Sequence, residues 1–408
     1  MGFISLSRGK RQKHTNNGDI SMRTAILQAP LFSVSGYGAY SRDVFRALLL
    51  STPYRVCGVP VKWGFSSEVQ GSDDFSKALA IACKTRPDKT EEGRIFLQVC
   101  LPKDFTPYNG CINIGITGGL EVDSLSEEEV ISTNRMDALI VPSIFTAEQF
   151  KAGGLSIPMF VVGQGVDVAT FRPLAGRPTS PALDKIDTPF NFLTGGEWFG
   201  NNPAEIDRKG IGETIRVFLD TFPDSKEVGL VVKAHTFNNS SSDEHLTAKK
   251  IAALKQGKEF PRVYLIHGRL SDEEMAALYN DGRIKAFVSP THGESWGRMI
   301  AESVSCDLPV IIGGWGGHMD YIDPKKATIL GYKLETVPNN VRPLYPAGAK
   351  WANSDPTELK RFMLRCHRKY SGAAERAEAL GIAFRQKLSE SITRSELART
   401  VIKIAEGK

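Results

Sequence analysis

The sequence predicts an α/β protein made of two doubly wound domains that face each other across a cleft. Short apolar runs recur along the chain, rich in Val and Ile and with little alternation. Such runs are typical of strands that are buried on both faces of a parallel sheet. Amphipathic helical patterns lie between the runs, as strand–helix alternation requires. With 408 residues, the chain is long enough to bury two separate cores.

Ten apolar runs are expected to form strands, five in each half of the chain. In order, they are Thr24–Leu27, Arg94–Val99, Ile112–Ile116, Ala138–Val141, Met159–Val162, Phe190–Leu193, Gly229–Val232, Val263–Ile266, Ala286–Val288 and Pro309–Ile312. Helical patterns occur at Tyr40–Leu50, Gly212–Thr221 and Asp272–Tyr279. Ser271 and Glu274 form a capping-box signature that opens the last of these helices.

A proline-rich segment near residues 173–189 divides the chain. It holds four prolines and lacks strong periodicity, which is typical of a linker. The expected organisation is a disordered basic tail over residues 1–21, a first domain over 22–175, a linker over 176–189, a second domain over 190–385 and a C-terminal helix over 386–408. Because parallel sheets bind ligands at the carboxyl ends of their strands, we expect the site in the cleft between the domains.

The overall composition narrows the class of protein. There are 51 Lys and Arg against 46 Asp and Glu, an excess that fits an anionic substrate such as a nucleotide diphosphate and also permits nucleic acid. The six cysteines form no CxxC pair, which indicates reduced thiols in a cytoplasmic protein. No apolar run approaches the roughly 20 residues of a membrane span. No metal-ligand motif is present, so we expect no metal ion.

The strongest functional motif follows the run Ala286–Val288 and reads SPTHGESWGRMIAE. Its two acids, Glu294 and Glu302, would lie about 10–12 Å apart along a helix axis, roughly the length of a sugar–diphosphate–ribose unit. Backbone N–H groups at the start of this helix could bind the diphosphate. The expected donor-binding residues here are Ser295, Trp296, Gly297 and Glu302. The alternative is an ordinary surface helix with two acids.

This motif resembles that of the retaining glycosyltransferases with the GT-B fold, family 4, whose Glu-x7-Glu signature is matched by Glu294 and Glu302. The resemblance extends over about residues 23–400. It implies that Glu294 contacts the donor sugar and Glu302 the ribose. It further implies two Rossmann-like domains, a last helix that crosses back onto the first domain, and hexosyl transfer from a nucleoside diphosphate sugar without a cofactor.

Basic residues are needed to neutralise the leaving diphosphate when no metal ion does so. By similarity to the family, Lys209 and Arg208 are the candidates, and together with Glu294 they form the predicted catalytic set. The family usually has its arginine several residues ahead of the Lys–Gly pair, whereas here the two basic residues are adjacent. Lys233, after a predicted strand, is a further donor-binding candidate. The alternative is a solvated basic pair at a helix start.

Three further loops complete the predicted cleft. The glycine-rich turn after the first strand lets the backbone approach a ligand closely, and the resemblance implies that it lines the donor diphosphate. The donor-binding candidates from these loops are Gly36, Tyr37, Gly38, Gly196 and Leu270. A loop after a first-domain strand supplies the acceptor-side candidates Thr117, Glu121 and Asp123.

The acceptor is left open by the sequence. The resemblance implies a glycan or lipid-linked glycan. A second possibility is a hydroxylated base in DNA, because the first-domain segments, among them the stretch at residues 134–143, resemble those of phage-encoded transferases. A non-catalytic sugar-nucleotide binding protein and an epimerase are alternatives from other classes.

Overall fold

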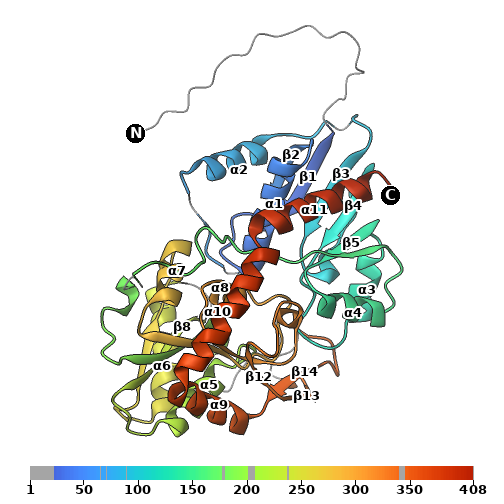
Figure 1. The fold of residues 1–408 in the computed structure, drawn as a ribbon. Helices are drawn as coiled ribbons and strands as arrows, with labels where there is room; N and C mark the ends of the chain where they lie inside the picture. Colours follow the sequence, from blue (N-terminus) through green and yellow to red (C-terminus); the bar gives the residue numbers. More distant parts are fainter. Residues whose placement is uncertain are drawn as a thin grey trace, which may run out of the picture.

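The fold comes from a computed structural model that describes residues 23–64, 66–69, 71–88, 90–176, 180–200, 207–236, 239–339 and 345–407 (Figure 1). The tail predicted over residues 1–21 lies outside this described part of the chain. Two parallel six-stranded sheets with helices around them confirm the predicted α/β fold class.

The first sheet lies in the N-terminal half and has the strand order β2-β1-β3-β4-β5-β6. Its strands are β1 (Thr24–Ala29), β2 (Arg55–Pro60), β3 (Arg94–Val99), β4 (Cys111–Ile116), β5 (Ala138–Val141) and β6 (Met159–Val161). Its helices are α1 (Gly36–Ser51), α2 (Asp74–Lys84), α3 (Glu127–Thr133) and α4 (Ile144–Ala152). All neighbouring strands pair in parallel, so their carboxyl ends share one edge.

The second sheet has the order β12-β11-β10-β7-β8-β9, again with parallel pairing. Its strands are β7 (Phe190–Glu197), β8 (Val228–His235), β9 (Arg262–Ile266), β10 (Ile284–Ser289), β11 (Val310–Gly313) and β12 (Thr328–Leu330). Its helices are α5 (Ile211–Thr221), α6 (Ser241–Lys255), α7 (Asp272–Asn280) and α8 (Arg298–Ser305). An antiparallel hairpin, β13 (Tyr332–Thr336) and β14 (Lys350–Ser354), follows this sheet.

Three helices end the chain: α9 (Pro356–Arg368), α10 (Tyr370–Lys387) and α11 (Glu390–Ala405). Figure 1 shows α10 and α11, in red, running from the second domain to the first. Leu397 and Val401 of α11 are buried in the same hydrophobic cluster as Val44 of α1. The C-terminal helix therefore packs into the first domain, although it begins at Glu390 rather than at the predicted residue 386.

The segment predicted as a linker packs against the second sheet. Leu183 and Ile186 are buried together with Leu193 of β7 and Val231 of β8. Phe171, which lies before the predicted linker, belongs to the same cluster. The described part of this segment therefore packs onto the second domain, because its apolar residues are buried there.

Helix α2 and strand β2 are elements that the sequence pattern did not indicate. Asp73, whose side chain accepts a hydrogen bond from the Ser76 N–H at 2.7 Å, is the N-cap of α2. In β2, only three of the six residues are buried, and Gly58 and Pro60 interrupt the apolar run. No helix in the described ranges is both long and apolar enough to cross a membrane.

Candidate active site

A cleft of about 610 Å³ separates the two domains and is lined by both. On the first-domain side, its wall is the start of α1 and the loops that follow β2 and β4. On the second-domain side, its wall comes from the ends of β7 and β8, the loop after β9 and the loop that joins β10 to α8. This is where the carboxyl ends of two facing parallel sheets place a ligand.

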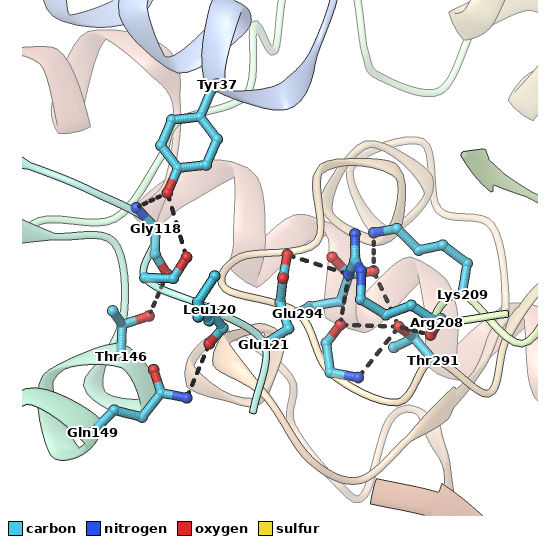
Figure 2. Close-up of polar contacts among 12 residues, drawn as sticks. Tyr37, Gly118, Leu120, Glu121, Thr146, Gln149, Arg208, Lys209, Thr291 and Glu294 are labelled. Atoms are coloured by element: carbon cyan, nitrogen blue, oxygen red, sulfur yellow. Dashed lines mark hydrogen bonds and ion pairs between the residues drawn. The ribbon is translucent and has the colours of Figure 1, made fainter. Parts of the chain in front are cut away.

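The centre of the second-domain wall is an ion pair between Lys209 and Glu294. The Lys209 Nζ atom lies 2.5 Å from Glu294 Oε1 (Figure 2). The Thr291 hydroxyl donates to the same oxygen at 3.4 Å. Burial alone would raise the pKa of the Glu294 carboxyl, but the charges of Lys209 and Arg208 outweigh burial and hold that pKa below its usual value. Glu294 is therefore an ionised carboxylate at neutral pH.

Arg208 joins the two walls of the cleft. Its Nη1 atom donates to the Gly293 carbonyl at 3.0 Å and lies 3.2 Å from Glu121 Oε1 on the first-domain loop. Burial lowers the pKa of the Arg208 guanidinium, but nearby acidic groups, above all Glu121, outweigh burial and raise that pKa. Arg208 therefore keeps its charge. Its position beside Lys209 gives the cleft two cations at one point. Both members of the adjacent Arg–Lys pair therefore line the cleft.

Helix α8 begins behind this pair. Its N-cap is Gly297, whose φ of 82° is left-handed, a backbone conformation that favours glycine. The residues at the start of the helix, Gly297 to Met299, line the cleft, and no acidic residue occupies the first turn. Glu302 is the fifth residue of α8, which places it about one turn into the helix, and Glu294 lies in the loop before it.

The carboxylate of Glu302 lies in a different environment from that of Glu294. Its Oε2 atom accepts a hydrogen bond from the Tyr279 hydroxyl at 3.0 Å, and its Oε1 atom lies 3.9 Å from Arg298 Nε. Burial dominates and raises the pKa of Glu302 to about 7. The two glutamates of the motif therefore differ in charge state near neutral pH, since only Glu294 has a full cationic partner within hydrogen-bonding distance.

On the first-domain wall, the hydroxyl of Tyr37 accepts a hydrogen bond from the Gly118 N–H at 3.0 Å and lies 3.0 Å from the Thr117 hydroxyl (Figure 2). Figure 2 also shows Gln149 beneath this loop, with its amide donating to the Leu120 carbonyl at 3.0 Å. These contacts hold the loop of residues 117–121 against the start of α1.

Most of the residues predicted for the site line this cleft. The structure places there Gly36, Tyr37, Glu121, Gly196, Arg208, Lys209, Lys233, Leu270, Glu294, Ser295, Trp296, Gly297 and Glu302. Two of these, Gly196 and Lys233, lie within β7 and β8, because both strands extend beyond the predicted limits. The Lys233 ammonium donates to the Gly268 carbonyl at 2.6 Å, and burial lowers its pKa to about 8.

Three predicted residues lie outside the cleft lining. Gly38 is buried behind it, where an added β-carbon would lie 2.0 Å from the Ser33 carbonyl oxygen. Thr117 is fully buried and reaches the cleft only through Tyr37. Asp123 accepts a hydrogen bond from the Lys350 N–H at 2.7 Å, so it ties the first domain to the β13–β14 hairpin.

Further residues of the cleft lie outside the set of predicted site residues. Arg298 lies 3.0 Å from Asp43 of α1, an ion pair that spans the two domains. Glu197 lines the wall beside the cations, and burial raises its pKa to about 7 even though Arg208 and Lys209 lower it. Trp63 lines the opposite wall. Arg298 could have been identified, because it belongs to the sequence motif and carries a charge four residues before Glu302. Trp63 could not, since no local sequence pattern surrounds it.

The fold and the cleft together define the architecture as GT-B, with two Rossmann-like domains facing each other. The chain is similar to sucrose-phosphate synthase from Thermosynechococcus elongatus, with a TM-score of 0.66 and 14% sequence identity, over 95% of this chain and 100% of that one. It is similar to HepE of Anabaena, solved with UDP and glucose, with a TM-score of 0.63 and 14% identity, over 93% and 100% of the two chains.

A glycosyltransferase from Rickettsia africae has the same fold, with a TM-score of 0.61 and 14% identity, over 95% of this chain and 98% of its own. No protein-family model matches the sequence, and no curated protein matches it either. At these identities, the similarity establishes the fold.

Proposed function

We propose that this protein is a retaining glycosyltransferase of the family 4 type, which moves a sugar from a nucleoside diphosphate sugar to a hydroxyl group. The observation that carries the proposal is the buried Lys209–Glu294 pair, 2.5 Å apart, in the cleft beside the start of α8. It supplies a cation for a leaving phosphate and a carboxylate for sugar hydroxyls at one point. HepE, which has the same fold, was solved with UDP-glucose, which supports a nucleotide sugar as the donor.

In the proposed reaction, the diphosphate lies against the N–H groups at the start of α8, with Lys209 and Arg208 compensating the charge that develops as it leaves. Glu294 accepts hydrogen bonds from the sugar, and Glu302 from the ribose. The acceptor oxygen bonds to the anomeric carbon on the face from which the diphosphate departs, as the bond from that carbon to phosphate oxygen breaks. The acceptor proton passes to the departing phosphate. These side chains provide the charge compensation, so no metal ion or cofactor is assigned a step.

The acceptor side of the proposal is a hydroxyl on a glycan or lipid-linked glycan. A hydroxylated DNA base is retained as the competing acceptor, to be distinguished by experiment. The six cysteines are all free thiols, which supports a reducing, cytoplasmic location.

The proposal is tested in two stages. Candidate nucleoside diphosphate sugars are first screened by thermal shift, since a ligand at 100 times its Kd stabilises the fold by about 2.7 kcal/mol. The donor that binds is then incubated with glycan acceptors and with hydroxymethylated DNA, and the anomeric configuration of the product is read by NMR. Retention of configuration is expected. If Glu294→Gln and Lys209→Ala both kept full transferase activity, the assignment of this site would be wrong.

A further inference from the structure

A pair of stacked aromatic rings lines the first-domain wall of the cleft. The rings of Tyr37 and Trp63 have centroids 4.5 Å apart and an interplanar angle of 25°. Both residues line the cleft, and Trp63 is half-buried, so part of its ring surface is open to a ligand. Aromatic faces bind flat apolar surfaces such as the C–H face of a sugar ring or a nucleobase. Tyr37 was among the predicted donor-binding residues, whereas Trp63 has no role in the proposed reaction.

The aromatic pair is connected to the proposed reacting centre. The Tyr37 hydroxyl accepts from the Gly118 N–H at 3.0 Å, which fixes the ring against the loop after β4. A β-carbon on Gly118 would lie 3.1 Å from the hydroxyl oxygen of Ser295. Ser295 is the neighbour of Glu294 in the sequence, so the aromatic wall adjoins the residue expected to contact the donor sugar. Trp63 and Glu294 therefore line one cleft, from its two opposite walls.

Polar groups line the same cleft as the aromatic pair. They include Ser66, Ser67, Gln164 and Glu121. The Ser66 hydroxyl donates to the Trp63 carbonyl at 2.8 Å and lies 2.7 Å from the Ser33 hydroxyl, so it is held between Trp63 and the loop before α1. An aromatic face in a cleft that also offers hydroxyl, amide and carboxylate groups suits a neutral, polyhydroxylated ring, because such a ring has one apolar face and many hydrogen-bonding groups.

The charges of this wall argue against a DNA strand. Its arginines already have partners: Arg42 donates to the Ser33 carbonyl at 2.7 Å, and Arg46 lies 3.4 Å from Asp43 Oδ1. The described lining of this wall has two carboxylates, Asp43 and Glu121, and two arginines, so the formal charges are equal in number. DNA binding draws its affinity from an excess of cations that can reach phosphates. The first-domain wall has no such excess among its described lining residues.

We propose that Trp63, backed by Tyr37, is a specificity-determining residue that holds the sugar ring of a glycan acceptor. This inference rests on the proposed function and specifies its acceptor. Donor binding is assigned to the second-domain wall of the cleft. Acceptor binding is assigned to Trp63 in the loop after β2, with Tyr37 of α1 behind it. Loss of the aromatic face would weaken acceptor binding and leave donor binding unchanged, because no donor-wall residue contacts the stacked pair in the described contacts.

The test uses the full-length protein with the donor found by screening, p-nitrophenyl hexopyranosides as acceptors and a hydroxymethylated DNA oligonucleotide as the competing acceptor. Trp63→Ala is expected to raise the acceptor KM about tenfold or more, while donor Kd and the hydrolysis of donor by water stay unchanged. Trp63→Phe, which keeps an aromatic face, should recover most of the loss. Tyr332→Ala is the matched control, since Tyr332 is an exposed aromatic residue outside the cleft lining.

An unchanged acceptor KM in Trp63→Ala would overturn the inference, and so would turnover of the DNA acceptor in place of all glycosides. In either case, donor binding and hydrolysis by the wild type would still support the proposed function. If the wild type neither bound nor hydrolysed any nucleotide sugar, the proposed function would fail, and this inference with it.

Discussion

Replacing Lys209 by Met tests the ion pair at the centre of the proposed site. The substitution keeps the length of the side chain and removes its charge, so Glu294 loses its closest cation, at 2.5 Å. Glu294 is only 7% exposed. Breaking a buried pair by removal of one partner costs roughly 3–5 kcal/mol, because the remaining charge stays desolvated. Removing one preorganised electrostatic group from an active site lowers kcat by roughly 10²–10³-fold.

Two measurements separate these effects. Denaturant unfolding gives the loss of stability, and sugar transfer under saturating donor gives kcat. The double variant Lys209→Met/Glu294→Gln should recover part of the stability, since neither charge of the pair remains, but none of the activity. Lys360→Met is the matched control: its Nζ atom lies 2.6 Å from Asp220 in an exposed pair. That variant should lose less than about 1 kcal/mol and keep full activity.

The reasoning would be refuted by a folded Lys209→Met protein with kcat within about threefold of wild type. It would also be refuted by equal stability losses in Lys209→Met and Lys360→Met, because the argument depends on the burial of one pair and the exposure of the other.

Three further predictions follow from the cleft. Because burial raises the pKa of Glu302 to about 7, donor affinity should fall as the pH drops below about 7, and Glu302→Gln should remove this dependence in a titration series. Between pH values of about 4.5 and about 7, Glu302 is protonated in the native state and ionised in the unfolded state. Its contribution therefore makes the free energy of unfolding decrease as the pH rises through this range. Asp43→Asn removes one of the two carboxylates that pair with Arg298, so the charge of Arg298 stabilises ionised Glu302 more strongly. The pH midpoint of donor binding should therefore move to a lower value, and an upward move would contradict this network. Gly293→Ala should reduce kcat at least about tenfold, since its β-carbon would lie 2.6 Å from the Glu121 carbonyl oxygen and force the walls apart, whereas Gly372→Ala, whose nearest contact is 3.6 Å away, should be neutral.

Continuous apolar runs were sufficient to locate many strands. β3 and β5 have the limits that the sequence indicated, because each is a run of mostly apolar residues without a break. The hairpin strand β13 could not be found in this way, since all five of its residues are exposed. The capping box of Ser271 and Glu274 was visible in the sequence because it is a local contact, and the structure has both of its hydrogen bonds.

Sequence separation sets the limit of what the pattern reveals about the site. Glu294 and Glu302 could be paired because they are eight residues apart in one motif, but Lys209 and Glu294 are 85 residues apart. They meet because β10 lies beside β7, so the loop that leads to α5 and the loop that leads to α8 share one edge of the sheet. Strand order depends on long-range packing, and no local pattern encodes it.

The sequence by itself determined the alternation of strands and helices, the polar loops after the strands, and the spacing of the Glu294–Glu302 motif, since each depends on residues near one another in the chain. Only the tertiary structure decided which loops face each other. It placed Glu121 against Arg208, Asp43 against Arg298 and Trp63 against Tyr37. It also set the charges, because the pKa values of Glu294 and Glu302 diverge through burial and through partners that lie on other elements.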